Sequence, residues 1–341
     1  MKEEPLLAAN QVGRQTITFG ILPRLVSMHT IVGTLEGKGP YGGYFHEVLE
    51  DDLLGQKTAE KAERQILENA VNEALRKGGL VPQDVQYYIS GDLLNQVISA
   101  VFSARSLGVP FLGIFSACGT FAQGLGLASI MLQGGFADKV MVATSSHYQT
   151  AERQYRYPIE LNIQHVPTNQ HTVTGAGACV LATEGEGPKI THATFGKVVD
   201  MGLKNPNDMG SAMAPAAFAT LEQHVQDTGR PPDYYDLILT GDLGRQGLKM
   251  LHVIAEKKGF ALGSNLQDGG ALIYGNDPKV GAGASGAACS AVMTLGFVAT
   301  QLYQGKLQKV LLIGTGALLN QLTIQQGDSI PTVAHAVAIE A

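Results

Sequence analysis

The chain has 341 residues, 45% of them hydrophobic, and a formal net charge of −6, a composition that indicates a globular protein able to bury a full core. It contains no basic run or polybasic tail, so the charge pattern argues against a nucleic-acid partner. Three cysteines, Cys118, Cys179 and Cys289, are too few for a disulfide framework and indicate a reducing compartment.

The start of the chain and its apolar segments bear on localisation. Residues 1–5 are acidic and lead into no apolar h-region, so we expect no signal peptide. No uninterrupted run of about 18 apolar residues exists, so we expect no transmembrane segment. The sequence therefore predicts a soluble or at most peripheral chain.

After a loop-rich stretch over 1–60, the first half alternates predicted helices and strands. Alanine and apolar residues recur at helical spacing over 58–77, and the glycine pair 78–79 ends this helix. The polar stretch 147–171 carries no predicted element. The other expectations are β-like runs at 16–19 and 30–34, strands at 85–90, 111–115, 139–145 and 174–182, a helix that ends at Leu107, and a helix over 121–134.

The second half follows the same order of elements. A glycine-rich loop is expected over 269–286, directly before a long helix. Strands that alternate with helices predict an α/β protein with a layered, mostly parallel sheet. The predicted strands are 189–200, 236–240, 309–315 and 333–339, and the helices are 213–227, 246–258 and 287–304.

The similar order of the two halves reflects a countable repeat. A shift of 150 residues places Pro82, Gly91, Asp92, Leu93 and Gln96 on Pro232, Gly241, Asp242, Leu243 and Gln246. A shift of 170 places Gly135, Lys139 and Val140 on Gly305, Lys309 and Val310, and puts Cys118 opposite Ala288. We predict two duplicated α/β halves, 1–185 and 186–341, about a pseudo-twofold axis, with the extra residues in the loop 269–286.

A duplicated unit predicts where a ligand binds. Equivalent strand ends converge at the centre, and ligands bind outside the carboxyl ends of parallel strands. Asp92, Asp242, Cys118 and the segment 281–290 lie at such ends, so one shared pocket is expected. Cys118 stands between a strand and a helix start, where a thiol is either activated by the helix dipole or simply a small buried side chain.

Several motifs resemble the thiolase and ketoacyl-synthase superfamily over nearly the whole chain. They are Ala117-Cys118-Gly119, Asp208-Met209-Gly210 with Ala214-Pro215-Ala216-Ala217, and Gly283-Ala284-Ser285-Gly286-Ala287. Within it, residues 90–340 resemble the stage V sporulation protein AD family of endospore-forming bacteria. The motifs are Gly91-Asp92-Leu93-Leu94-Asn95-Gln96, Ala143-Thr144-Ser145-Ser146-His147, Ala151-Glu152-Arg153-Gln154, Arg156-Tyr157-Pro158, the run 208–217 and the run 237–243.

The resemblance implies a thiolase-like fold with α-β-α-β-α layers and a protein that is not an enzyme. Such a protein binds dipicolinic acid (pyridine-2,6-dicarboxylate) and its calcium complex, needs no other cofactor, and supports uptake of dipicolinate into the developing spore. It works with membrane proteins of the spore dipicolinate transport system, at the periphery of the spore inner membrane. Thiolase-like folds also pair through an edge strand, which implies a homodimer.

The residues themselves depart from the catalytic pattern of that superfamily. Thiolases carry a histidine in a Gly-His-Pro run, where this chain reads Gly275-Asn276-Asp277-Pro278. Neither the histidine nor the asparagine of ketoacyl synthases stands in 240–243, and the glycine-rich loop contains no histidine. Because a cysteine nucleophile needs a base, we predict no catalytic residue. The alternatives are an acyl transferase that uses Cys118, and a scaffold with a vestigial pocket.

The predicted ligand-binding residues are Cys118, Asp92, Asn95, His147, His224, Asp242, Ser285 and Ser290, and no resident metal site is predicted. Asp92 and Asp242 are interpreted as acceptors in the pocket, as calcium ligands when calcium arrives with dipicolinate, or as simple helix caps.

Each remaining candidate has a structural alternative. His224 fits a core histidine as well as a ligand contact, and the two serines fit either the pocket wall or, for Ser290, the helix core. Arg153 and Arg156 either supply charge to the pocket or pair with Glu152 and Glu160. Cys179 lies inside an apolar strand and is interpreted as packing.

Overall fold

The computed structural model describes residues 7–156 and 165–341. Its main sheet consists of two five-stranded parts that meet at one residue pair, Arg24 with Lys189. The strands are β3 (Arg24–Val32), β5 (Tyr87–Gly91), β6 (Phe111–Gly113), β7 (Lys139–Ser146) and β9 (Gly175–Ala182), then β10 (Lys189–Phe195), β11 (Leu237–Thr240), β12 (Leu266–Asp268), β14 (Lys309–Ala317) and β15 (Thr332–Glu340).

Both parts of the sheet have the same topology. The first runs β3-β9-β7-β5-β6 and the second β10-β15-β14-β11-β12. In each, the second strand is antiparallel to both of its neighbours, and the last three strands are parallel. The structure therefore confirms two duplicated α/β halves, but the sheet is mixed and not mostly parallel as predicted, because the second strand of each half runs against its neighbours. The division at residue 185 stays a prediction.

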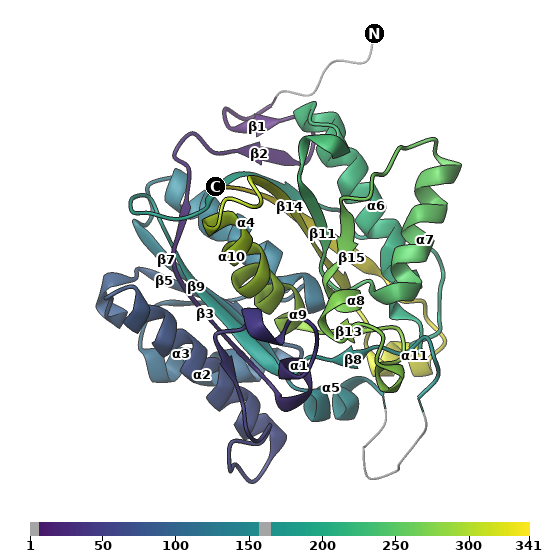
Figure 1. Cartoon of the computed structure of the whole chain (residues 1–341), viewed down its shortest axis with the longest axis horizontal. Coiled ribbons are helices and arrows are strands. Elements are labelled where there is room, and N and C mark those ends of the chain that lie inside the picture. Colours follow the sequence, from purple (N-terminus) through teal and green to yellow (C-terminus); the bar gives the residue numbers. More distant parts are fainter. Residues whose placement is uncertain (1–6, 157–164) are drawn as a thin grey trace.

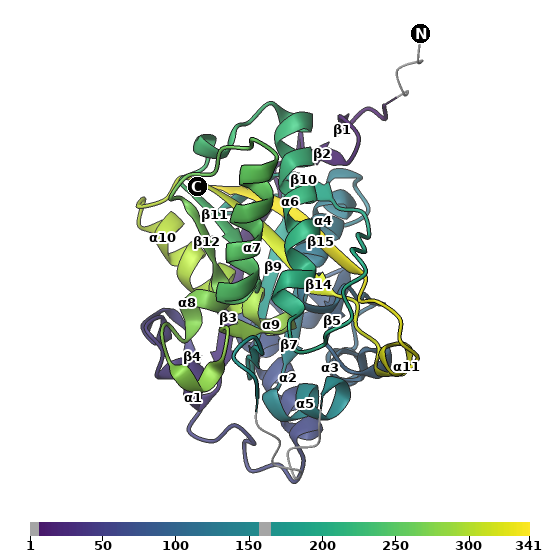
Figure 2. The ribbon, with the colours of Figure 1, turned by 90° about the vertical axis from the view of Figure 1, so that its right-hand side faces the viewer.

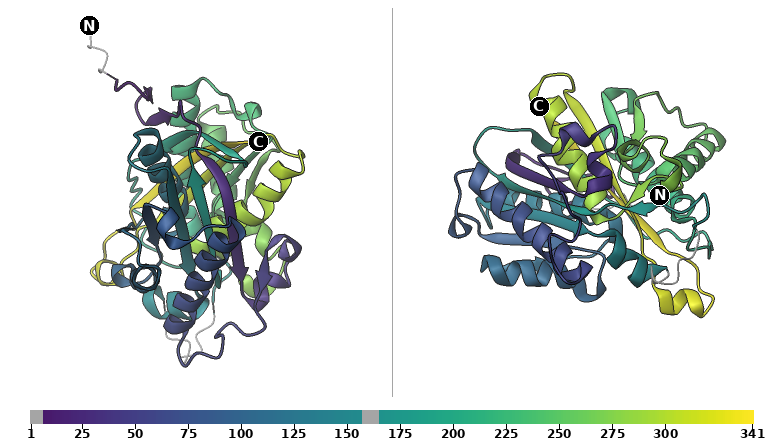
Figure 3. Two further views of the ribbon diagram at one scale, coloured as in Figure 1. Left: turned by 90° about the vertical axis from the view of Figure 1, so that its left-hand side faces the viewer. Right: turned by 60° about the horizontal axis from the view of Figure 1, so that its bottom comes forward.

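The helices form three layers around the two parts of the sheet (Figures 1 and 2). Helices α2 (Ala59–Lys77) and α3 (Ile98–Leu107) cover the outer face of the first part. Helices α6 (Met209–Thr228) and α7 (Gly244–Lys257) cover the second part. Between them lies α4 (Thr120–Gln133), which packs on both β7 and β14. This is the expected α-β-α-β-α order, also visible in Figure 3.

The strands in the middle layers are apolar throughout because both of their faces are covered. In β7, Val140 and Val142 face the central core with α4, whereas Met141 faces α2. In β14, Leu312 belongs to the central core and Leu311 to the core under α6 and α7. Successive side chains of a strand point to opposite faces, so each such strand joins two cores.

The long helix before β14 is continuous but not uniform. It consists of α9 (Ala287–Val292), a π-helical segment (Met293–Val298) and α10 (Ala299–Tyr303). Within residues 7–156 and 165–341, no helix combines the length and apolar character needed to cross a bilayer.

Several elements differ from the sequence expectations. The polar stretch 147–171 contains a helix, α5 (Tyr148–Tyr155), and a short strand, β8 (His171–Thr172). The glycine-rich loop contains the helix α8 (Gly269–Ile273) and the strand β13 (Ala284–Ser285), which pairs with β8. These elements are short and polar or glycine-rich, so local propensity alone does not indicate them. Strand β12 was missed for its length of three residues.

Smaller elements complete the fold. Strand β1 (Gln11–Val12) pairs with β2 (Thr16–Thr18), which in turn pairs with β10. Strand β4 (Glu47–Val48) pairs with β3. The short helices α1 (Thr34–Gly37) and α11 (Gln321–Gln325) follow β3 and β14.

Candidate functional site

Cys118 lies in a tight turn at the start of α4. The turn Ala117–Gly119 is 3-10 helical, and Ala117 has a φ of 49°, in the left-handed region that non-glycine residues rarely adopt. Thr120 fixes the turn, because its hydroxyl accepts from the Ser116 amide at 3.0 Å and donates to the Ala117 carbonyl at 2.6 Å. The turn therefore holds Cys118 in one defined position between the two halves.

The thiol of Cys118 is held in its neutral form. The residue is only 8% exposed and packs with Leu93, Ala151 and Ala287. Burial raises the pKa of the Cys118 thiol well above its ordinary value, and the negative charge of Asp242 and a hydrogen bond with it raise this pKa further. A reactive cysteine needs the opposite environment, one that favours the thiolate.

Asp242 follows β11 and faces the thiol. Its carboxyl accepts hydrogen bonds from the Gly286 amide at 3.0 Å and the Thr315 hydroxyl at 2.8 Å. Burial raises the pKa of Asp242 to about 7. The Ser290 hydroxyl donates to the Cys118 carbonyl at 3.4 Å. We call Cys118, Asp242, Ser290 and the Gly286 amide the elbow cluster. The structure brings these predicted residues together from both halves.

Asp92 has the same place in the first half as Asp242 in the second but a different role. Its two carboxyl oxygens accept from the amides of Leu94 and Ala100, each at 2.8 Å. These bonds hold the loop before α3 and the first turn of that helix. Asp92 therefore acts as a helix cap, one of the roles that the sequence allows for it. Burial raises the pKa of Asp92 to about 6. In the second half, Asp268 accepts the loop amides in the way that Asp92 does here.

Three other predicted residues make structural contacts. His147 caps α5 through Nδ1, and its Nε2 lies 3.0 Å from the Asp52 carbonyl. His224 is buried in the C-terminal core, between the Thr194 hydroxyl at 2.7 Å and the Tyr235 hydroxyl at 2.6 Å. This placement agrees with the core-histidine alternative. Ser285 is buried in β13, with its hydroxyl 3.5 Å from that of Thr172. Cys179 packs in the central core, as predicted.

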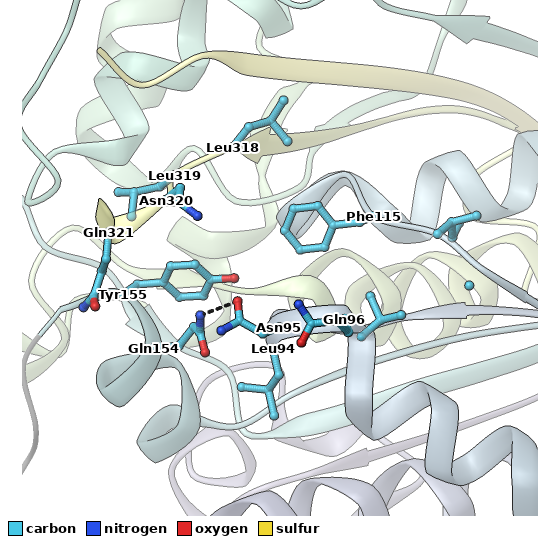
Figure 4. A pocket seen from close by; sticks show the side chains of 13 residues that line it. Leu94, Asn95, Gln96, Phe115, Gln154, Tyr155, Leu318, Leu319, Asn320 and Gln321 are labelled. Carbon is cyan, nitrogen blue, oxygen red and sulfur yellow. Dashed lines mark hydrogen bonds between the residues drawn. The ribbon is translucent and has the colours of Figure 1, made fainter. Parts of the chain in front are cut away.

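A cavity of about 380 Å³ lies beside the elbow cluster (Figure 4). Phe115 and Tyr155 face each other across it, and Asn95 accepts a hydrogen bond from Gln154 at 2.9 Å in its wall. Of the eight predicted binding residues, only Asn95 lines this cavity. The full lining is Leu94, Asn95, Gln96, Val97, Gly113, Ile114, Phe115, Gln154, Tyr155, Leu318, Leu319, Asn320 and Gln321.

Tyr155 separates the cavity from Cys118. Its hydroxyl donates to the Leu93 carbonyl, and its ring packs against the residues around Cys118 together with Leu318. Both Tyr155 and Leu318 also line the cavity, whereas Cys118 does not. Cys118 therefore lies one layer of side chains below the cavity instead of forming its floor.

A buried ion pair borders the same region. Arg156 pairs with Glu152, and both side chains are almost inaccessible to solvent. His165 lies 3.3 Å from the second Glu152 oxygen. Arg156 also lines a second cavity of about 230 Å³, which shares Tyr155, Leu319 and Gln321 with the first. Within the described residues, the Nε of Arg156 is buried and has no hydrogen-bond acceptor.

The other arginine of this region points elsewhere. Arg153 forms an exposed pair with Glu60 at 2.5 Å, so its partner is not one of the predicted carboxylates. Glu160, the other expected partner, lies outside the described residues.

Backbone strain is also concentrated at the cavity. Gln96 and Val97 both line it with positive φ values of 59° and 48°. A β-branched residue in this region costs free energy that the surrounding structure must supply, and such residues cluster at functional sites. The sequence gives no sign of this strain, although Gln96 belongs to one of the family motifs.

Sequence reasoning also missed Tyr155 and the segment 318–321. In the sequence, Tyr155 stands between the motifs 151–154 and 156–158. The only signal for the segment 318–321 is that it follows the predicted strand 309–315. For metals, residues 7–156 and 165–341 contain no group of three or more His, Cys, Asp or Glu side chains placed to hold an ion.

The two-part sheet with a cysteine turn at its centre defines a thiolase-like fold, and solved structures confirm this fold. A 3-oxoacyl-[acyl-carrier-protein] synthase III from Aquifex aeolicus superposes with a TM-score of 0.56 at 15% identity, covering 94% of this chain and all of that one. Human mitochondrial 3-ketoacyl-CoA thiolase, in complex with CoA, gives 0.57 at 15% identity over 95% of this chain and 99% of its own. At these identities the likeness shows the fold alone.

The sequence matches are more specific. The family model for stage V sporulation protein AD matches residues 13–340. Stage V sporulation protein AD of Bacillus subtilis is 46% identical over 328 residues, which cover 96% of this chain and 97% of that protein. This chain therefore belongs to the stage V sporulation protein AD family.

Proposed function

We propose that this protein binds dipicolinate in the cavity beside Tyr155, without catalysing a reaction, and so supports its uptake into the developing spore. The observation that carries the proposal is the buried Arg156 beside a cavity with aromatic walls. Its Nε is a charged donor without an acceptor in the described part of the chain. A buried donor without a partner is costly, so an incoming carboxylate would gain from it.

The cavity matches the chemistry of a flat aromatic dianion. Phe115 and Tyr155 offer ring faces for stacking. The side-chain amides of Asn95, Gln154, Asn320 and Gln321 can donate hydrogen bonds to carboxylate oxygens. Asp92 and Asp242, which would repel a dianion, do not line the cavity. Specificity would then come from the polar side chains that line the site beside its two aromatic rings.

The environment of Cys118 supports a binding role over acyl transfer. The groups that act on the thiol pKa are Asp242, the Gly286 amide and Arg156, none of which is a general base of the histidine type. Asp242 itself accepts the thiol hydrogen bond, but it makes thiolate formation harder because it adds negative charge. Acyl transfer by Cys118 is tested by incubation with acyl-CoA followed by intact mass. A stable adduct that is lost in Cys118→Ser would contradict the proposal.

The binding site is tested by equilibrium dialysis of dipicolinate with paired substitutions. Glu152→Gln with Arg156→Gln removes both charges of the buried pair and leaves no lone carboxylate behind. We expect it to weaken dipicolinate about tenfold to a hundredfold, the value of a charge-assisted hydrogen bond. The matched control is Glu60→Gln with Arg153→Gln, an exposed pair one turn away. Equal affinities for the two double variants would contradict the proposed site.

Partners and assembly are also part of the proposal. We infer a homodimer that pairs through β6, which in the described residues pairs only with β5 and leaves Leu112 42% exposed. We further propose that membrane proteins of the dipicolinate transport system hold the chain at the spore inner membrane, and that calcium enters with the ligand. Light scattering on the purified chain tests the dimer, and a monomeric mass at all concentrations would contradict it.

A further inference from the structure

A second and larger concavity, of about 660 Å³, lies between the β1–β2 strand pair and the end of α4. It shares no residue with the cavity beside Tyr155. Its apolar lining includes Ile17, Phe19, Ile130 and Phe195, and Phe136 at its edge is 71% exposed. A concave apolar site of this volume is typical of small-molecule binding. We call it the hairpin groove.

The charged residues of the hairpin groove all have one sign. Arg14 and Lys197 line it, and its other polar lining residues are the uncharged Asn10, Gln11, Gln15 and Gln133. Both cations are exposed, and in the described part of the chain neither forms a salt bridge. An apolar floor below two cations is complementary to a ligand with an apolar body and an acidic head.

The groove is held in shape by hydrogen bonds behind it. The carboxylate of Asp227 on α6 accepts from the amides of Arg14 and Gln15, at 3.0 and 2.9 Å, and from the Thr16 hydroxyl at 2.9 Å. On the other side, the Gln133 side chain accepts from the Ile21 amide at 2.8 Å. These bonds fix β2 against α6 and the end of α4. The groove is therefore preformed, which lowers the free energy that a ligand must spend on ordering it.

We propose that the hairpin groove binds one alkyl chain of an anionic amphiphile, with that chain on the floor and the acidic head beside Arg14 and Lys197. A peptide in the same place would bring backbone N–H and C=O groups onto the apolar floor, where they would lack partners. An alkyl chain has no such groups. The head group belongs either to a free fatty acid or to an anionic membrane lipid, and both share this chemistry.

Calorimetry with dodecanoate, below its micelle concentration, tests the proposal on the full chain. Each methylene buried is worth a few-fold in affinity, so decanoate should bind roughly tenfold more weakly than dodecanoate. Arg14→Glu with Lys197→Glu should weaken dodecanoate by about tenfold and leave dodecanol unchanged. Lys257→Glu with Lys258→Glu, on the exposed end of α7, is the matched control. Ile130→Glu, which places a carboxylate on the floor, should abolish binding.

Sedimentation with phosphatidylglycerol vesicles identifies the source of the head group. If dodecanoate binds and the groove variants weaken this binding, the result supports the proposal with a free acid as the ligand. Binding to vesicles alone, lost in Ile130→Glu, supports it with a membrane lipid as ligand. Circular dichroism and thermal unfolding establish that the variants fold. Absence of both interactions, or affinities that do not change between the groove variants and the α7 control, overturns the proposal.

Discussion

The buried carboxyl of Glu36 should make the stability of this protein depend on pH, and Glu36→Gln should remove that dependence. Glu36 is buried beside β9 and accepts from the Thr174 amide at 3.0 Å and the Tyr274 hydroxyl at 2.5 Å. Its other oxygen has no partner within the described residues. Burial, with a further contribution from the charge of Asp52, raises the pKa of Glu36 from 4.5 to about 7.

The sign and size of the effect follow from these values. Because the folded-state pKa lies above the unfolded-state pKa, the folded protein holds an extra proton between about pH 4.5 and pH 7. The stabilisation is full below pH 4.5 and is lost as the pH rises through 7. At 1.36 kcal/mol per pH unit, ionised Glu36 costs about 3 kcal/mol when fully charged, and about 2 kcal/mol of this falls between pH 5.5 and 8.5.

Urea unfolding of the wild type and Glu36→Gln at pH 5.5 and pH 8.5 measures this difference. The amide of glutamine keeps an oxygen for both hydrogen bonds and carries no charge. The advantage of the variant should therefore grow by about 2 kcal/mol from the lower to the higher pH. Other buried carboxyls, such as Asp242, titrate in both proteins and cancel in the comparison. A difference that stays constant with pH would refute the reasoning.

Three other predictions concern the elbow cluster and the cavity. Wild-type protein should react very slowly with a thiol reagent at pH 8, because all three cysteines are buried. Tyr155→Ala should expose one reactive thiol, and adding Cys118→Ser to that variant should remove it. No gain in reactivity in Tyr155→Ala would contradict the placement of Tyr155 over Cys118. Asp92→Ala should lower the free energy of unfolding by about 1 to 2 kcal/mol, because the helix cap is lost. The affinities for dipicolinate and for its calcium complex, measured by dialysis, should not change. Weaker binding of the calcium complex alone would show that Asp92 is a calcium ligand. Cys118→Ala should change dipicolinate affinity only mildly. Cys118→Phe should abolish binding, because the larger side chain would displace Tyr155 into the cavity. Equal dipicolinate affinities for these two variants would place the ligand elsewhere.

The fold could be predicted from the sequence where burial dictates the residue type. Strands such as β7 and β14 are covered on both faces, so they appear as continuous apolar runs whose ends the sequence locates well. The helix α5 escaped prediction because its sequence is polar and it is fixed by contacts with distant residues. The repeat was found because turn residues such as Gly91 and Gly241 keep their identity between the halves.

The site could be predicted only in part, because its geometry depends on contacts between residues far apart in sequence. The repeat correctly places Asp92 and Asp242 at equivalent strand ends, yet one caps a loop and the other faces Cys118. This divergence depends on Gly286 and Thr315, which no local pattern links to Asp242. The cavity walls also come from segments that are far apart in sequence. Which residues line the cavity depends on the direction of their side chains, which the sequence does not show.

Calorimetric titration of dipicolinate, with and without calcium, tests the central claim most directly. The side-chain amides that line the cavity, with Arg156 in the adjoining cavity, predict saturable binding of one pyridine-2,6-dicarboxylate per chain. It also predicts much weaker binding of the 3,5-isomer, whose carboxylates are spaced differently around the ring. No heat at millimolar dipicolinate, or equal affinity for both isomers, would contradict a dipicolinate site in this cavity.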